Sequence, residues 1–174
     1  RMATDKIMAL ADRITATDEE SAEAVFEALL LTGIGMSFTK TSRPASGTEH
    51  IVSHFWECKK LLEGKLSDFH GKKVGVATLY IMEIYEKLYQ KLTVTAHKEK
   101  VDWDDVYAHY GSLKEEVEKL NTPDTITDGI NPKDVEDKWE EIRKIIASVP
   151  SRKEIYEAMV KAGCALTASD IAVS

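Results

Sequence analysis

Apolar residues recur every three or four positions along most of the chain, which is the pattern of amphipathic helices. The strongest repeats cover residues 17–36, 48–63 and 71–94. The last of these is apolar on most sides over its first half, so we expect it to be the central buried helix. Shorter helices are expected at 3–14, 102–109, 112–120, 132–148 and 152–162. No strand-like alternation is present, and the sequence predicts an all-α, multi-helix bundle.

Polar residues at the expected helix starts support these boundaries. Four residues of the types that favour N-caps precede the shorter helices: Asp102, Ser112, Asn131 and Ser151. Thr17 followed by Glu20 has the spacing of a capping box. Gly33 and Gly35 predict close packing near the end of the second helix, and residues 40–47 are rich in Thr, Ser, Pro and Gly, as loops are.

The length and charge narrow the class of protein. The chain has 174 residues, enough for one domain with a substantial core, so residues 1–174 are interpreted as one helical domain. A net charge of −7 and short, interrupted basic runs argue against a nucleic-acid partner. No apolar run reaches the length of a membrane span, so no membrane partner is expected.

The two cysteines indicate a reducing, cytoplasmic location. Cys58 and Cys164 lie far apart in the sequence and form no C-x-x-C motif, so a disulfide framework is not expected. We interpret both thiols as small buried or half-buried side chains. The start at Arg1-Met2-Ala3, inside a helical pattern, is typical of a fragment boundary.

Three histidines are the main candidates for chemistry. His50 and His54 are four residues apart and share a face of the expected helix, and His70 begins the next helix. Imidazole nitrogens bind zinc, iron or nickel, and a catalytic zinc takes three protein ligands. The alternative is that these histidines are hydrogen-bonded core or surface residues. His97 and His109 have no partner in helical register and are expected on the surface.

The loop before these histidines has residues suited to an anion. The Arg43 guanidinium fits a phosphate or carboxylate, and Ser46, Gly47 and Thr48 lie at an expected helix start. An anionic substrate beside a metal is one interpretation. The other is that Ser46 or Thr48 caps the helix and that Arg43 pairs with an acidic side chain.

Two motifs give the chain a resemblance to a known family. The run from Ser42 to Glu57 reads SRPASGTEHIVSHFWE and resembles a characteristic segment of the sn-glycerol-1-phosphate dehydrogenases. The run from His70 to Thr78 reads HGKKVGVAT and resembles their second motif, which is shared with iron-containing alcohol dehydrogenases, glycerol dehydrogenases and dehydroquinate synthases. The resemblance is strong over residues 17–80 and weaker over 150–174.

The resemblance implies a two-domain enzyme of which this chain is the helical, metal-binding half. It implies that an N-terminal nucleotide-binding domain and the last helix are absent from the chain. His50 and His70 would bind a divalent metal, with zinc as first choice and nickel or iron as alternatives. An aspartate outside the chain would complete the set. His54 would lie near the metal and the nicotinamide and relay a proton.

The implied reaction interconverts dihydroxyacetone phosphate and sn-glycerol 1-phosphate, with NAD or NADP bound by the absent domain. Residue chemistry then assigns the phosphate of this small-molecule substrate to Arg43 and Ser46. We expect the isolated chain to be inactive, and an exposed apolar face to favour a homo-oligomer. The alternatives are glycerol dehydrogenase, another dehydroquinate synthase-like enzyme, or a noncatalytic helical interaction module whose acidic residues 98–149 contact a partner.

Overall fold

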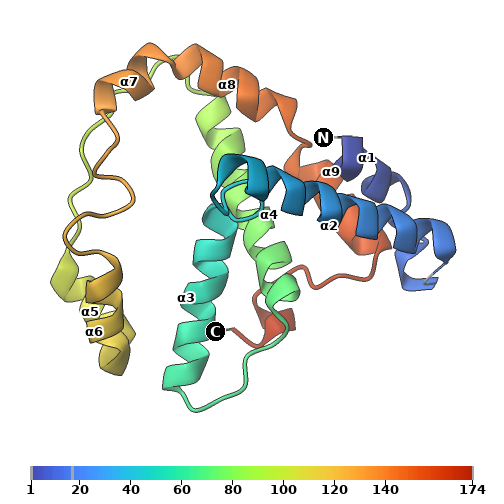
Figure 1. The fold of residues 1–174 in the computed structure, drawn as a ribbon, viewed down its shortest axis with the longest axis horizontal. Helices are drawn as coiled ribbons and strands as arrows, with labels where there is room; N and C mark the ends of the chain where they lie inside the picture. The colour runs from blue at the N-terminus through green and yellow to red at the C-terminus, as the bar shows by residue number, and fades with distance from the viewer. Residues whose placement is uncertain (1, 17, 174) are drawn as a thin grey trace.

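The fold was analysed in a computed structural model that describes residues 2–16 and 18–173. Every regular element in these residues is a helix, which confirms the all-α prediction (Figure 1). The α-helices and 3-10 turns follow one another in the order α1 (Met2–Ala9), η1 (Ile14–Ala16), α2 (Glu19–Thr39), α3 (Thr48–Leu62), α4 (His70–Tyr89), α5 (Trp103–Tyr110), η2 (Gly111–Leu113), α6 (Lys114–Leu120), α7 (Pro132–Asp137), α8 (Trp139–Ser148), α9 (Arg152–Lys161) and η3 (Ser169–Ile171).

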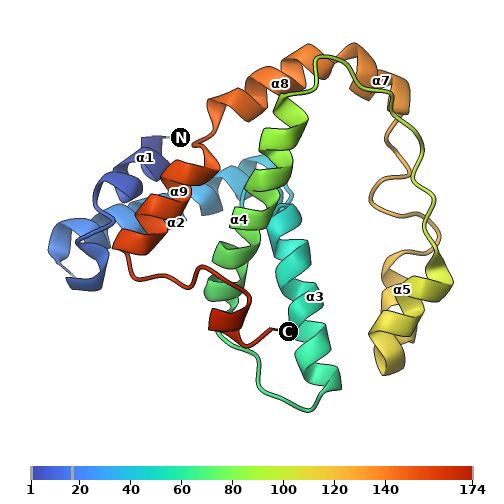
Figure 2. The same cartoon turned by 180° about the vertical axis from the view of Figure 1, so that it is seen from behind.

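Helix α4 is the centre of the molecule, as its apolar sequence predicts. It packs against α3, α8 and α9, and Figure 2 shows it between these elements. Its buried residues include Val76 and Ala77, both with no exposed surface, and Leu79. The first half of α4 also buries Lys73, which is a charged residue in an apolar setting and requires a partner.

The structure tests the predicted helix starts. Three of the four predicted N-caps are confirmed, since the side chains of Asp102, Asn131 and Ser151 accept backbone N–H groups of the first turn. Ser112 is not an N-cap, because α5 passes through η2 directly into α6 without an intervening loop. Thr17 lies outside the described residues, and Asp18 caps α2 by accepting from two backbone N–H groups.

The prediction of a single helix over 132–148 is also corrected. The chain leaves the helical path at Lys138, which divides the segment into α7 and α8. The first helix is likewise shorter than predicted, since α1 ends at Ala9 and a 3-10 turn follows. These differences concern where helices begin and end, and local capping determines those positions.

Replacing Ser151 with alanine is expected to lower the free energy of unfolding by about 1 kcal/mol. The Ser151 hydroxyl accepts from Glu154 N at 3.2 Å, and Glu154 Oε2 accepts from Ser151 N at 2.7 Å, so both halves of a capping box are present. Ser112→Ala is the matched control and is expected to change nothing measurable. Urea denaturation followed by circular dichroism compares the two variants, and equal losses would contradict this account of the cap.

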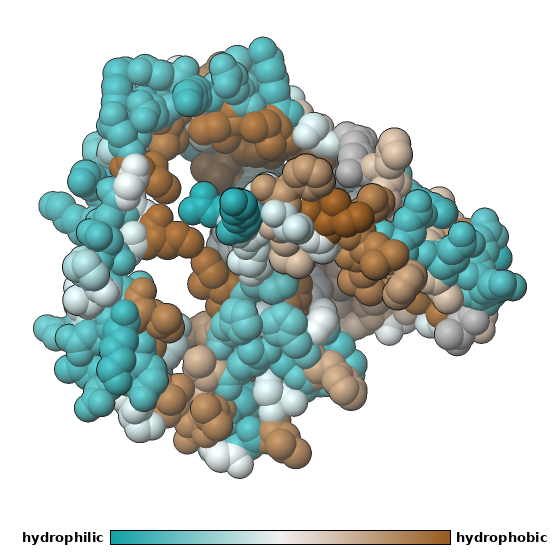
Figure 3. Space-filling view, viewed as in Figure 1, coloured by the Kyte–Doolittle hydropathy of each residue, from teal (hydrophilic) through white to brown (hydrophobic). Residues whose placement is uncertain are grey.

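The molecule exposes far more surface than a compact chain of its size. Its accessible area is 12287 Å², whereas a folded monomer of this mass exposes roughly 8,500 Å². Much of the excess is apolar and lies on α2, where Phe26, Leu30, Ile34 and Phe38 are all more than half exposed. Figure 3 shows hydrophobic residues gathered over this part of the molecule.

Helix α2 packs mainly against α1, so its apolar stripe has no partner among the described residues. Gly33 has open space around it, and Gly35 only approaches Pro44 of the following loop, so the predicted close packing at these glycines is limited to Gly35. The prediction that no run reaches membrane-spanning length is wrong for Glu19–Thr39, which is long and apolar enough to cross a membrane. One such helix is a weak indication, because core helices and signal sequences share this composition.

We expect the chain to self-associate through the stripe on α2, because large exposed apolar patches are unfavourable in water. Phe26→Ser combined with Leu30→Ser should shift sedimentation toward the monomer and leave the unfolding midpoint nearly unchanged, since both side chains are exposed. Glu23→Ser, an exposed change on the same helix, is the control. A wild-type chain that stays monomeric at high concentration would contradict the expectation.

Candidate metal centre

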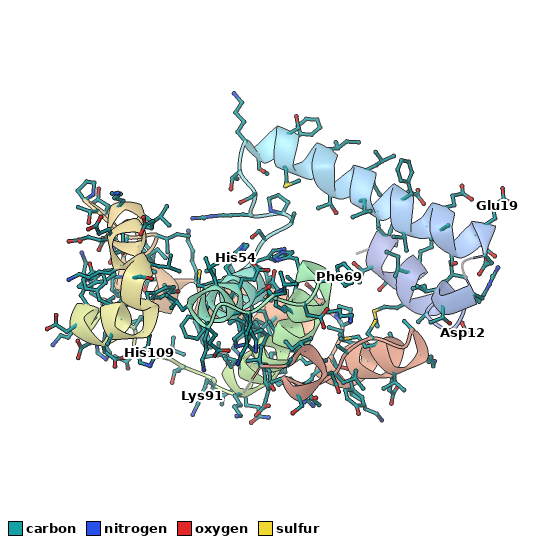
Figure 4. The ribbon with its side chains drawn as sticks, turned by 90° about the horizontal axis from the view of Figure 1, so that it is seen from below. Asp12, Glu19, His54, Phe69, Lys91 and His109 are labelled. Atoms are coloured by element: carbon teal, nitrogen blue, oxygen red, sulfur yellow. The ribbon has the colours of Figure 1, made fainter. Side chains whose placement is uncertain are left out.

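The three histidines singled out in the sequence converge in space. His50 and His54 lie one turn apart on α3, and His70 is the first residue of α4. The ring centroid of His70 is 5.3 Å from that of His50 and 5.1 Å from that of His54. Figure 4 shows His54 on the side of the α3–α4 pair that faces α2. The spacing of the motifs therefore predicted a cluster that exists in the fold.

Each imidazole contacts a carboxylate through the same ring nitrogen. Nδ1 of His50 lies 2.9 Å from Glu49 Oε1, Nδ1 of His54 lies 2.9 Å from Glu57 Oε2, and Nδ1 of His70 lies 2.8 Å from Glu57 Oε1. A carboxylate accepts hydrogen bonds, so each ring is assigned the tautomer with hydrogen on Nδ1. Nε2 of each ring then keeps a lone pair, which is the arrangement found in metal-binding histidines.

Glu57 connects the histidine cluster to a buried lysine. Beside its contacts with two imidazoles, it lies 3.3 Å from the ammonium of Lys73, whose side chain is only 2% exposed. Lys73 Nζ also donates to the carbonyl oxygen of Asp68. Partial burial raises the pKa of Glu57, but the hydrogen bonds from His70, His54 and Lys73 outweigh it and lower the pKa to about 2. The carboxylate is therefore ionised at neutral pH.

Glu57 belongs by geometry to a possible metal-binding group, since one donor atom each of His54, Glu57 and His70 lie within 4.8 Å of one another. The Lys73 ammonium opposes that arrangement. It lies 3.3 Å from Glu57 Oε1 and repels a cation placed on that oxygen. Among the described residues, the predicted ligand His50 is not part of the group of donor atoms that could share a metal ion.

The predicted substrate residues lie in the loop that leads into α3. Arg43 is exposed and makes no ion pair among the described residues, and Ser46 is half-buried. Neither Ser46 nor Thr48 caps the helix, because the N-cap is Gly47 and no side chain fills that role. The Gly47 N–H donates to Glu49 Oε1 at 2.8 Å, so a carboxylate already occupies part of this helix start.

The two remaining histidines and the two cysteines are found where expected, with one exception. His97 and His109 are exposed, and Cys58 is half-buried, but Cys164 is exposed rather than buried. A separate hollow of about 540 Å³ lies around the stacked rings of Trp103 and Tyr107. None of the clustered histidines lines it, so it is distinct from the candidate metal centre.

The sequence analysis did not identify Glu57 and Lys73, the residues that support the histidines. Glu57 stands three residues after His54, which places both on one face of α3, and this spacing is a signal for their contact. Lys73 has the spacing of the buried face of α4, three and four residues before Val76 and Ala77, but its partner lies on another helix and has no such signal. Ser53 is fully buried and its Oγ lies 3.4 Å from Nδ1 of His70, a long secondary contact.

The described fold and site define a class of protein, namely an all-helical unit in which His54, Glu57 and His70 form a group that could hold a metal ion. The chain is homologous to curated proteins named glycerol-1-phosphate dehydrogenase [NAD(P)+]. It is 35% identical to the one from Geobacillus stearothermophilus over 120 residues, which are 66% of this chain and 30% of the relative.

Other relatives with the same name come from other organisms. The Halalkalibacterium halodurans protein is 42% identical over 76 residues, or 44% of this chain and 19% of the relative. The Methanosarcina barkeri protein is 37% identical over 92 residues, or 53% of this chain and 25% of the relative. The match thus spans less than a third of each relative. No protein-family model matches the chain. No solved structure matches it either.

Proposed function

We propose that this chain is the helical, metal-binding part of an oxidoreductase that interconverts dihydroxyacetone phosphate and sn-glycerol 1-phosphate with NAD(P). The observation that carries the proposal is the convergence of three imidazoles, 5.1 and 5.3 Å from centroid to centroid, in a chain homologous to proteins named for this activity. The name of the relatives supplies the substrate and the nicotinamide cofactor, and the cluster supplies the place for a metal.

The residues have separate roles in this proposal. His50 and His70 hold a divalent cation through Nε2, with zinc as first choice and nickel or iron as alternatives. When bound, such a cation supplies Lewis acidity toward the substrate oxygen. His54, whose side chain is 61% exposed, exchanges a proton with that oxygen or with a water beside it. The Arg43 guanidinium binds the phosphate, and Ser46 lies next to it in the same loop.

The hydride donor is assigned to residues that are not in this chain. The described residues contain no strand, and the dinucleotide-binding folds of dehydrogenases are built on parallel strands. We therefore propose that the isolated chain folds but has no activity of its own. We further propose that the enzyme is cytoplasmic, that it needs neither nucleic acid nor a membrane as partner, and that the exposed stripe on α2 supports a homo-oligomer.

The test is NAD(P)H oxidation by the full-length protein that contains this chain. Dihydroxyacetone phosphate should support oxidation after loading with zinc or nickel, and the product should be sn-glycerol 1-phosphate rather than its 3-phosphate enantiomer. A preference for unphosphorylated substrates would identify a glycerol dehydrogenase instead. Failure of every metal and every such substrate to support oxidation would favour the noncatalytic interaction module.

A further inference from the structure

One carboxylate contacts two of the three clustered imidazoles. Glu57 Oε2 faces Nδ1 of His54 at 2.9 Å and Glu57 Oε1 faces Nδ1 of His70 at 2.8 Å. The two rings are stacked, with an angle of 29° between their planes. Because both rings turn Nδ1 toward the same carboxylate, both turn Nε2 away from it.

Glu57 itself is held in place from the protein interior. Its Oε1 lies 3.3 Å from the Lys73 ammonium, which is nearly fully buried and also donates to the Asp68 carbonyl oxygen. A buried ammonium is costly without a partner, so the Lys73–Glu57 pair has little freedom to separate. The carboxylate therefore has one fixed position, unlike the exposed ion pairs elsewhere on the surface.

We infer that Glu57 is a positioning residue which, held by Lys73, sets the tautomer and ring orientation of His54 and His70 together. The inference deepens the proposed function, because it explains how a metal-binding imidazole and a proton-exchanging imidazole keep their Nε2 atoms on one side. Glu57 does not touch the substrate in this arrangement. It acts through the two rings, and Lys73 acts through Glu57.

The arrangement also links two helices. Glu57 and His54 belong to α3, whereas His70 and Lys73 belong to α4. The carboxylate thus fixes the relative placement of two imidazoles whose backbones lie on different elements. His50 has a separate partner in Glu49, which is the residue next to it in the chain. That second carboxylate gives a matched control, since it contacts one imidazole and neither of the other two.

The experiment is a two-bond proton–nitrogen NMR spectrum of the metal-free, 174-residue chain at alkaline pH, where imidazoles are neutral. A free neutral imidazole prefers hydrogen on Nε2. We expect His54 and His70 to carry hydrogen on Nδ1 in the wild type. In Glu57→Gln, an amide offers one acceptor and one donor in place of two acceptors, so at least one of the two rings should change to the Nε2–H form.

Glu49→Gln should alter His50 alone and leave the tautomers of His54 and His70 as they are in the wild type. Nε2–H tautomers at both positions in the wild type would overturn the inference, even if Glu57→Gln failed to fold. Tautomers that do not change in a folded Glu57→Gln chain would also overturn it. None of these results depends on substrate or cofactor, so a failure here is distinguishable from failure of the dehydrogenase assay.

Discussion

His54→Ala in the full-length, metal-loaded protein is expected to lower turnover by about 10²- to 10⁴-fold, the usual contribution of a positioned general acid or base. The metal content should stay near that of the wild type. His54 is the most exposed of the three imidazoles, with 61% of its side chain open to solvent against 21% for His50 and 45% for His70. A solvent-exposed imidazole is better placed to exchange a proton than to serve as a ligand of an enclosed metal ion.

Two measurements on the same preparations check this expectation. Metal content by atomic emission should be stoichiometric in His54→Ala and strongly reduced in His50→Ala, since only His50 and His70 are assigned as ligands from this chain. Steady-state rates should then show a loss of kcat in His54→Ala without a loss of metal. If His54→Ala instead loses its metal in proportion to its activity, His54 is a ligand and the division of roles is wrong.

The sequence predicted the parts of this site that depend on helical periodicity. The apolar pattern of residues 71–94 identified the central helix, although α4 ends at Tyr89. The four-residue interval between His50 and His54 placed both rings on one face. The same analysis placed His70 at the start of the next helix, and its ring lies 5.3 Å from that of His50. Local spacing was sufficient for these residues because neighbouring turns of one helix determine it.

The features that the sequence did not predict depend on contacts between segments that are far apart in the sequence. Lys73 lies three and four residues before the buried Val76 and Ala77, but the run HGKKVGVAT gives no sign of its partner Glu57, which lies on α3. Ser112 has the residue type of an N-cap, but Leu113 is continuous with the next helix and no cap is needed. Which apolar stripe stays exposed also depends on how the helices pack, and in the described residues it is the stripe on α2.

Trp139→Ala is expected to lower the free energy of unfolding by about 3 to 5 kcal/mol, the usual cost of removing a buried tryptophan. Trp139 begins α8 and is only 8% exposed. Its indole Nε1 donates to the carbonyl oxygen of Lys91 at 2.8 Å, just beyond the end of α4. The substitution removes both a large apolar side chain and the hydrogen-bond donor of that carbonyl. The free-energy cost of the cavity and that of the lost hydrogen bond therefore add together.

Arg143 also joins α8 to the end of the central helix. Arg143 Nε donates to the Tyr89 carbonyl oxygen at 3.0 Å, and its guanidinium lies 5.1 Å from the centroid of the Tyr89 ring. Only nine apolar residues are buried among those described, so each one carries a large share of a stability that is typically about 5 to 15 kcal/mol.

Two further variants separate the contributions of the Trp139 side chain. Trp139→Phe keeps an aromatic ring and loses the donor, so it should cost distinctly less than the alanine variant. Trp103→Ala removes a half-buried indole from α5, away from α4, and should cost less as well. Chemical denaturation of the three variants gives the comparison. A Trp139→Ala chain within 1 kcal/mol of the wild type, in the range expected for surface substitutions, would show that α8 is not fastened to α4 through this residue.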